Sequence, residues 1–273
     1  MKGWAAGVAI VLVVVAAGLG LWVTWDSTQT AATDPVPPPA TQGTTTSRPQ
    51  AGDEEVPLAT STTLPPPCTA GDEVVTGDPA AGWDRVVIDT AHSLPEDFVP
   101  PDLVTVREAG FPTMDQVRSI IIADLAALRE AADANGTPLV IVSGYRSYEY
   151  QSQLYQRRVN QVGETEAAQR TARPGHSEHQ LGTAVDVLDP NAGDLTLDFA
   201  ATPQGQWIAA HSWEYGFVLS YPDGGDDRTC YGYEPWHLRY VGRENAEAIH
   251  EAGVTPREWL LSHPAETSTG PGG

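Results

Sequence analysis

Residues 175–186 read GHSEHQLGTAVD and run into the apolar segment 183–188, whose composition predicts a buried strand. Asp186 lies inside that segment between two valines, and His179 precedes it by seven residues. A carboxylate in such apolar surroundings is costly to bury unless it is paired, hydrogen-bonded or bound to a metal. The stretch therefore predicts a functional aspartate in a buried strand, with a histidine close to it in sequence.

A second short motif, EPWH at residues 234–237, supplies another histidine with a carboxylate three residues before it. Two imidazoles and one carboxylate, from His179, His237 and Asp186, would give a tetrahedral zinc ion three protein ligands and leave its fourth position for water. An open position is typical of a catalytic zinc site rather than a structural one. Glu234 is then free to take a proton from the water on zinc, whose acidity the metal raises.

These motifs carry a family resemblance. The pattern SxHxxGxAxD at residues 177–186, followed by ExxH at residues 234–237, resembles the zinc signature of the VanY-type D-alanyl-D-alanine carboxypeptidases. That family is related to the D-Ala-D-Ala dipeptidases and to the sonic hedgehog signalling domain. The upstream run SGYRSYEYQSQLY at residues 143–155 resembles the substrate-side motif of the same family. With the three blocks in order, the resemblance covers most of residues 68–264.

The resemblance implies roles for seven residues and one Zn²⁺ per chain. The implied roles are zinc ligation by His179, Asp186 and His237, proton transfer by Glu234, and substrate contacts by Arg146, Gln151 and Ser177. Arg146 also has a physical argument of its own, because it follows a predicted buried strand and a glycine. Its fixed fork of donors suits a terminal carboxylate or a developing oxyanion, so we assign it a catalytic role as well.

The implied activity is hydrolysis of the C-terminal D-alanine from peptidoglycan stem peptides. Three alternatives remain open at this point. An L,D-carboxypeptidase or a murein endopeptidase would use the same zinc site, and a zinc-containing binding module would use it without hydrolysis. Glu234 argues against the last alternative, since a structural site gains nothing from a spare general base.

The remaining pattern predicts an α+β domain with a small, mainly antiparallel sheet, packed helices and the zinc site at the strand ends. The predicted helices span residues 113–135, 147–172, 202–215, 243–252 and 256–261, and the predicted strands span residues 139–142, 183–188, 217–221 and 236–241.

Sequence composition divides the 273 residues into four parts. Residues 1–25 hold an uncharged apolar run from residue 3 onward, which predicts a membrane anchor, with signal-peptide cleavage near Ala31 as the alternative. Residues 26–67 are rich in Pro and Thr and predict a disordered linker. The family resemblance implies that residues 68–264 are a zinc carboxypeptidase domain, and the small polar residues 265–273 predict a disordered tail. With Lys2 before the apolar run and Asp26 after it, the positive-inside rule predicts a single-pass membrane protein whose domain faces the cell wall.

Charge and cysteine content limit the partners. The chain has 15 Lys and Arg against 36 Asp and Glu, a formal net charge of −21, which argues against a nucleic-acid partner. No protein partner is inferable from the sequence. The two cysteines, Cys68 and Cys230, form an isolated pair in a predicted exported domain, which favours a disulfide over a metal site or two unpaired thiols.

Overall fold

The computed structural model describes residues 68–264. The predicted anchor at residues 1–25, linker at residues 26–67 and tail at residues 265–273 lie outside this range. Among the residues described, no helix combines the length and the apolar character that crossing a bilayer requires.

The centre of the domain is a four-stranded sheet in the order β5-β6-β8-β7, with every neighbouring pair antiparallel. Its strands are β5 (Val140–Ser143), β6 (Ala184–Leu188), β7 (Phe217–Leu219) and β8 (His237–Tyr240). The α+β class and the small antiparallel sheet predicted from the sequence are thereby confirmed. All five residues of β6 are buried, so Asp186 lies where the pattern predicts.

Strand pairing brings the functional motifs together. Asp186 on β6 pairs with Ser143 on one side and with His237 on the other. The register between β5 and β6 shifts between Ile141 and Ser143, and the intervening Val142 is left partly exposed. Such irregularities turn a strand locally and are common beside functional sites.

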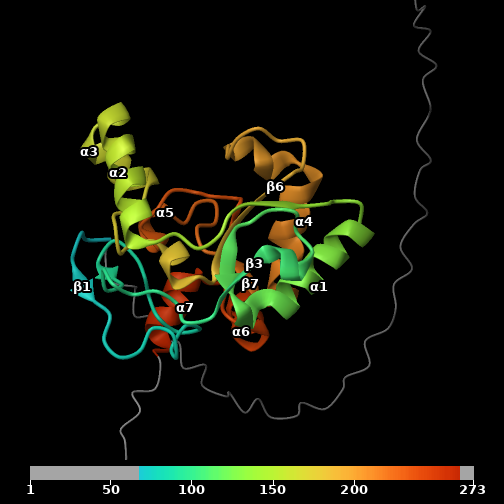
Figure 1. The fold of residues 1–273 in the computed structure, drawn as a ribbon, viewed down its shortest axis with the longest axis horizontal. Helices are drawn as coiled ribbons and strands as arrows, with labels where there is room; N and C mark the ends of the chain where they lie inside the picture. Colours follow the sequence, from blue (N-terminus) through green and yellow to red (C-terminus); the bar gives the residue numbers. More distant parts are fainter. Residues whose placement is uncertain (1–67, 265–273) are drawn as a thin grey trace, which may run out of the picture. The chain divides into compact units, whose positions relative to one another are not determined.

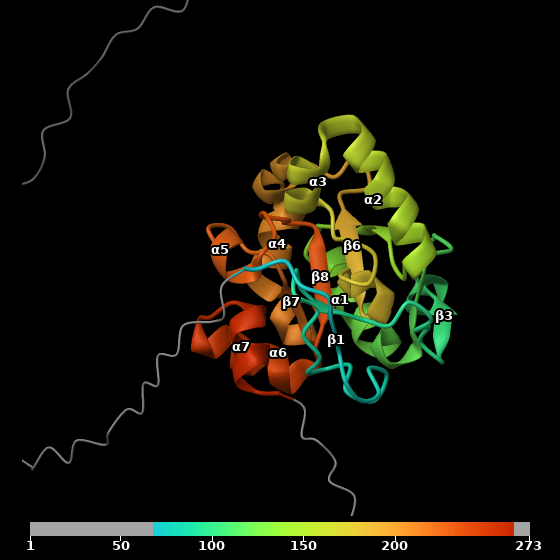
Figure 2. The same ribbon diagram turned by 90° about the vertical axis from the view of Figure 1, so that its left-hand side faces the viewer.

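One face of the sheet packs against α1 (Ile122–Ala134). Buried leucines of α1, Leu125 and Leu128, share a core with residues of the sheet such as Ile141, Val187 and Phe217. A second core lies under α6 (Arg243–Ala252) and α7 (Pro256–Ser262), which Figure 2 shows beside the lower end of the sheet. The helix α7 begins with a reciprocal capping box between Thr255 and Glu258.

The predicted helix at residues 147–172 is two helices, α2 (Tyr148–Val162) and α3 (Glu164–Arg170). Gly163 interrupts them with φ 84° and ψ 161°, a conformation outside the helical region that glycine adopts at little cost. The side chain of Ser147 caps α2 by accepting a hydrogen bond from the backbone N–H of Tyr150. Both helices rise from the body of the domain at the upper left of Figure 1.

The predicted helix at residues 113–135 begins later than expected. Its first part forms β4 (Gln116–Arg118), which pairs with β3 (Leu103–Thr105), and a 3-10 turn at Ser119–Ile121 precedes α1. Arg118 donates to the carboxylate of Asp102, which adds a side-chain tie to that pairing. Tertiary pairing therefore overrides the helical spacing that the sequence shows at this point.

Other elements refine the prediction. The predicted helix at residues 202–215 divides into α4 (Pro203–His211) and a 3-10 turn at Ser212–Tyr215, and the short α5 (Asp226–Thr229) was not predicted. Further 3-10 turns span Val106–Ala109, Glu178–Leu181 and Leu197–Ala201.

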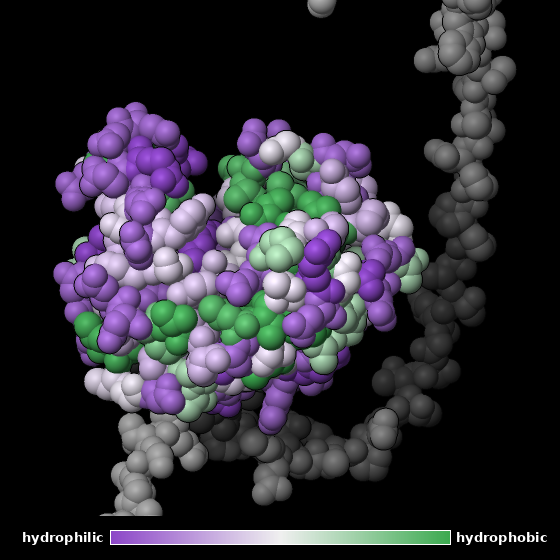
Figure 3. Space-filling view, in the orientation of Figure 1, coloured by the Kyte–Doolittle hydropathy of each residue, from purple (hydrophilic) through white to green (hydrophobic). Residues whose placement is uncertain are grey.

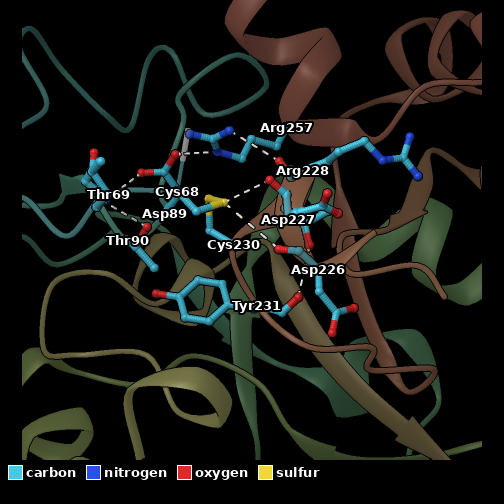
Figure 4. The surroundings of a disulfide bond; sticks show 12 residues. Cys68, Thr69, Asp89, Thr90, Asp226, Asp227, Arg228, Cys230, Tyr231 and Arg257 are labelled. Carbon is cyan, nitrogen blue, oxygen red and sulfur yellow. Dashed lines mark hydrogen bonds and ion pairs between the residues drawn. A yellow bond between two sulfur atoms is a disulfide. The ribbon is translucent and has the colours of Figure 1, made fainter. Parts of the chain in front are cut away.

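The first described segment also contains β1 (Glu73–Val74), which pairs in parallel with β2 (His92–Ser93). Its first residue, Cys68, is joined by a disulfide to Cys230, with the two Cα atoms 5.1 Å apart across a sequence separation of 162. Figure 4 shows this bond between Asp89 and Arg257 on one side and Tyr231 on the other. The disulfide ties the start of the domain to the chain just before Glu234.

Candidate active site

A cavity of about 310 Å³ opens beside the central sheet and contains all of the predicted site residues. Val142, Tyr150 and Leu195 are among the other residues that line it. In Figure 3 the surface is hollowed between the part formed by α2 and α3 and the part formed by the chain after β6. The sequence motifs, which are spread over about a hundred residues, therefore meet in one place.

Three potential metal donors lie at the buried end of this cavity. One ligand atom from each of His179, Asp186 and His237 lies within 4.8 Å of the others, and all three side chains are buried. Asp186 Oδ1 is 3.3 Å from His179 Nε2 and 3.1 Å from His237 Nδ1. These distances bring the two imidazoles and the carboxylate together as the spacing predicts.

His179 is held with one nitrogen turned toward the cluster. Its Nδ1 lies 2.7 Å from the carbonyl oxygen of Gly144, to which it donates, so Nε2 keeps its lone pair. Burial, together with the neighbouring charge of Arg146, lowers the pKa of His179 to about 4, although Asp186 opposes both effects. A neutral imidazole that carries no proton on Nε2 is the form that binds a metal.

Two glycines make this placement possible. A side chain at Gly144 would collide with the backbone carbonyl oxygen of Gln116, just where the chain passes His179. Gly182 ends the 3-10 turn that carries His179, with φ 77°, and a Cβ there would lie 2.9 Å from a side-chain carbon of Arg118. The glycines of both motifs thus serve close backbone approach and a left-handed turn.

His237 faces the cluster with Nδ1, because its Nε2 lies 2.9 Å from Oε2 of Glu178. Burial disfavours the charged imidazolium, but hydrogen bonds to Asp186 and Glu178 outweigh it and raise the pKa of His237 to about 10. A metal ion at this site would take the place of the Nδ1 proton.

The donor set fits zinc. Two imidazole nitrogens and one carboxylate oxygen are the ligands of open, catalytic zinc sites, and His237 has the carboxylate partner that zinc-bound histidines use. Zinc ligation by His179, Asp186 and His237 remains a prediction about this chain, now with a geometry that suits it.

Arg146 is the most highly connected side chain of the site. Its Nε donates to Ser143 Oγ at 3.0 Å and its Nη1 to Gln151 Oε1 at 3.2 Å. Its Nη2 lies 2.7 Å from both Asp186 Oδ2 and His179 Nε2. The guanidinium group is therefore fixed on two sides and directed at the donor cluster by its third nitrogen.

Gln151 and Ser177, the other predicted substrate contacts, differ in their surroundings. Gln151 is 1% exposed, and its amide donates to the carbonyl oxygen of Ala172 while its oxygen accepts from Arg146. Ser177 lines the cavity, and within residues 68–264 its hydroxyl makes no hydrogen bond. The geometry suits Ser177 for direct contact with a ligand and Gln151 for holding Arg146.

Glu234 lies at the edge of the donor cluster. Its Oε2 is 3.9 Å from His237 Nδ1, and its side chain is 24% exposed. Burial, helped by the negative charges of Asp186 and Glu178, raises the pKa of Glu234 to about 7. The positive charges of His237 and Arg146 oppose this rise. A carboxyl group with a pKa near neutrality is suited to accept and return a proton.

Sequence reasoning missed three residues that contact this site. Glu178 and its partner Arg239 lie behind His237, and the ring of Tyr221 lies 4.9 Å from the His237 ring, with which it lines the cavity. Arg239 could have been found from strand geometry. Side chains alternate between the two faces of a strand, so Arg239, two residues after His237, lies on the same face of β8. Glu178 occupies a variable position of the motif, and nothing in the spacing marks it. Tyr221 carries no signal of its own.

A second, larger hollow adjoins the first. It measures about 1100 Å³ and shares Leu195, Tyr231, Glu234 and Trp236 with the smaller cavity. The site thus continues from the donor cluster along the chain that follows the disulfide.

Comparison with known proteins identifies the family. The family model described as VanY, D-alanyl-D-alanine carboxypeptidase, matches residues 114–243. The putative carboxypeptidase YodJ of Bacillus subtilis is 37% identical over 173 residues, which cover 61% of this chain and 63% of the relative. The chain thus spans less than two thirds of that protein's length.

Two solved structures extend the match. The LD-carboxypeptidase LdcB is 34% identical, with a TM-score of 0.58, covering 64% of this chain and 84% of that one. A mutant of the vancomycin-resistance D,D-pentapeptidase VanY, in complex with Zn(II), is 28% identical, with a TM-score of 0.57, covering 65% of this chain and 99% of that one. With the three motifs assembled around one buried cluster, the chain belongs to the VanY D-alanyl-D-alanine carboxypeptidase family of zinc peptidases.

Proposed function

We propose that this chain is a zinc-dependent D,D-carboxypeptidase that hydrolyses the C-terminal D-alanine from peptidoglycan stem peptides. The observation that carries the proposal is the meeting of a His-Asp-His donor set with a carboxyl group of raised pKa and a fixed arginine in one cavity. These are the components that metal-assisted peptide hydrolysis requires.

Each component has a distinct task. A zinc ion held by His179, Asp186 and His237 would polarise the scissile carbonyl group and increase the acidity of the attacking water. Glu234 accepts the proton of that water on its carboxylate and then delivers it to the leaving amine of D-alanine. Its place at the edge of the donor cluster, with Oε2 3.9 Å from His237 Nδ1, suits both halves of this transfer.

Arg146 supplies a positive charge beside the donor cluster. Ser143 and Gln151 hold two of its nitrogens, so little conformational freedom is lost when the third meets a ligand. We assign it to the terminal carboxylate of the peptide or to the oxyanion that develops at the scissile carbonyl. Ser177, whose hydroxyl has no partner within residues 68–264, is assigned to the peptide backbone.

The larger hollow would hold the part of the stem peptide that precedes its C-terminal residue. A stem peptide continues away from its C-terminal residue, and the hollow of about 1100 Å³ begins where the smaller cavity ends. Leu195 and Trp236 belong to both and give the peptide an apolar wall at the junction.

L,D-carboxypeptidase activity is a second candidate, and one observation favours it. The LD-carboxypeptidase LdcB shares 34% identity with this chain, against 28% for the D,D-pentapeptidase VanY. The two reactions differ in the configuration of the residue before the scissile bond, and both use the same metal and base.

Mass spectrometry of muropeptides distinguishes the candidates. The full chain, loaded with zinc, is incubated with purified pentapeptide, tetrapeptide and cross-linked muropeptides, and the mass lost from each is recorded. Loss of one alanine from pentapeptides alone supports the D,D activity, whereas loss from tetrapeptides supports the L,D activity. Cleavage of cross-linked dimers into monomers would instead identify an endopeptidase, and a zinc-loaded chain that cleaves none of them is a binding module.

We also propose that residues 1–25 anchor the chain in the cell membrane with residues 68–264 on the cell-wall side. The uncharged run at residues 3–25 and Lys2 before it support this placement. Protease added to cells stripped of their wall should remove the domain while the membrane stays intact. A domain that is protected until the membrane is lysed would contradict the proposal.

A further inference from the structure

The imidazole of His237 is held from behind by a buried carboxylate. Glu178 is 5% exposed, and its Oε2 lies 2.9 Å from His237 Nε2, on the side of the ring opposite the donor cluster. The other nitrogen, Nδ1, lies 3.1 Å from Asp186 Oδ1. Since a neutral imidazole carries one N–H proton, a partner that accepts a hydrogen bond from Nε2–H leaves the lone pair on Nδ1.

Glu178 is itself fixed by two donors. Arg239 Nη1 donates to its Oε1 at 2.9 Å, and Ser220 Oγ donates to its Oε2 at 2.6 Å. Arg239 is 1% exposed and lies two residues after His237 on β8, so both side chains reach the carboxylate from one strand. The positive charge of Arg239 lies against this buried carboxylate, so the carboxylate is both hydrogen-bonded and paired with a charge.

Arg239 is in turn held by the start of the domain. Its Nη2 donates to the carbonyl oxygens of Trp83 at 3.2 Å and Val86 at 2.6 Å. A continuous set of buried contacts therefore runs from this N-terminal segment through Arg239 and Glu178 to His237.

We propose that Glu178 is a positioning residue of the metal site, which holds His237 with Nε2 protonated and Nδ1 free for the metal. The inference rests on the proposed zinc site and adds to it a residue that no motif marks. Arg239 and Ser220 fix the carboxylate, and the carboxylate fixes both the orientation and the tautomer of the ring.

Glutamine cannot replace Glu178 here, although it has nearly the same shape. All three groups around the carboxylate, His237 Nε2, Ser220 Oγ and Arg239 Nη1, approach it as donors. The amide of a glutamine has two orientations here. In one, its NH₂ group faces Arg239, which offers no acceptor. In the other, its NH₂ group faces His237, which would then have to accept through Nε2 and carry its proton on Nδ1. Both arrangements weaken the presentation of Nδ1.

The test compares the full chain with Glu178→Gln, measuring the dissociation constant of zinc by competition with a chelator. Residues that orient metal-binding histidines typically contribute 10- to 100-fold in affinity, so zinc should bind Glu178→Gln about 10- to 100-fold more weakly. The visible absorption of the cobalt(II)-loaded protein should change as well, because it reports the ligand geometry directly. Circular dichroism of the metal-free protein checks that the variant is folded.

Asp102→Asn is the matched control. It likewise replaces a carboxylate that pairs with an arginine by the corresponding amide, but the arginine, Arg118, is outside the metal site. It should leave zinc affinity and the cobalt spectrum unchanged. If Glu178→Gln does not fold, Ser220→Ala decides: weaker zinc binding in a folded variant supports the inference, and unchanged binding overturns it.

Different results would overturn the positioning role of Glu178 and the zinc site itself. A folded Glu178→Gln with wild-type zinc affinity and cobalt spectrum would overturn the positioning role and leave the zinc site intact. A wild-type chain that binds no zinc would overturn the zinc site and this inference with it.

Discussion

Asp186 and His237 lie opposite each other on adjacent antiparallel strands, and the carboxylate Oδ1 is 3.1 Å from the imidazole Nδ1. Cross-strand neighbours have Cβ atoms about 5 Å apart, so the register of β6 and β8 alone brings two of the three metal donors together. A shift of one residue in that register would turn one side chain to the other face of the sheet. Strand pairing thus directly places two of the three candidate donors, and the 3-10 turn before β6 supplies the third, His179.

Removal of either imidazole should abolish zinc binding. The full chain is expected to bind about one zinc ion, and His179→Ala or His237→Ala should bind none at stoichiometric zinc, because two remaining ligands do not hold the ion. Elemental analysis after gel filtration measures the content. His211→Ala, a change at a partly exposed histidine paired with Glu214, should retain zinc. Full zinc content in both ligand variants would refute the assignment.

Glu234→Gln should separate metal binding from catalysis. Glu234 is placed to exchange protons and not to hold the metal, so zinc content and fold should be unchanged while turnover falls about 10²- to 10⁴-fold. Release of D-alanine from a pentapeptide ending in D-Ala-D-Ala measures the rate. Glu166→Gln, at an exposed position of α3, serves as the control. A variant Glu234→Gln as active as the wild type would mean that another group is the base.

Arg146→Lys should lower kcat/KM while zinc stays bound. A lysine keeps the charge but cannot contact Ser143, Gln151 and the donor cluster at once, as the guanidinium does. Hydrogen bonds to charged groups contribute about 1.5–3 kcal/mol, which corresponds to a loss of about 10- to 100-fold. Arg157→Lys, an exposed change on α2, should have no effect on steady-state kinetics. Equal kinetics for Arg146→Lys and the wild type would remove Arg146 from the mechanism.

The disulfide should contribute measurably to stability. Closing a loop with a sequence separation of 162 restricts the unfolded chain by up to about 5 kcal/mol in the entropic model. The double variant Cys68→Ser/Cys230→Ser should therefore unfold at a lower urea concentration than the oxidised wild type. Thiol titration of the denatured chain, with and without reductant, checks the bond. Two reactive thiols before reduction would show that the bond does not form.

The pair Asp89–Arg257 should make stability depend on pH at acid values. The carboxylate of Asp89 lies 2.6 Å from Arg257 Nε and accepts from the backbone N–H groups of Ala91 and His92. Burial opposes its ionisation, but Arg257 and these hydrogen bonds outweigh burial and lower its pKa. The folded state then binds this proton less readily than the unfolded state, so the stabilisation is present above about pH 4 and is lost as the pH falls further.

Asp89→Asn tests this dependence. At pH 7 the variant should be less stable by about 1.5–3 kcal/mol, since it replaces the charge-assisted hydrogen bond between the Asp89 carboxylate and Arg257 Nε with a weaker neutral one. The difference from the wild type, measured by urea unfolding, should shrink between pH 4 and lower values as Asp89 itself becomes protonated. A difference that stays constant across this range would show that ionisation of Asp89 is not its source.

The sequence predicted the site better than the elements around it. The meeting of His179, Asp186 and His237 was predictable because a zinc site, which stays a prediction for this chain, restricts both residue type and spacing, and the pairing of β6 with β8 places two of the three. Glu178 was not predictable, because its importance depends on Arg239 and Ser220, which approach it from other parts of the chain. Spacing in sequence carries no information about such contacts.

Element boundaries were missed for a similar reason. The apolar spacing of residues 113–135 is helical throughout, yet Gln116–Arg118 pairs with Leu103–Thr105 in preference to extending α1. The segment before residue 103 has no strong periodicity, and it holds its place by contacts such as those of Arg239 with Trp83 and Val86. Periodicity predicts elements that bury one face locally, and it fails where distant pairing decides.

The disulfide also decides which part of the domain would carry a pulling force applied to the chain ends. A pull on the backbone ahead of Cys68 passes through the sulfur atoms directly to Cys230, so residues 69–229 form a closed covalent loop that tension cannot straighten. His179 and Asp186 lie inside that loop, whereas Glu234 and His237 lie beyond it, on the part of the chain that would carry the force. Under tension between the two ends of the domain, the strand β8 would therefore be the first to leave the donor cluster, and the other two donors would remain together.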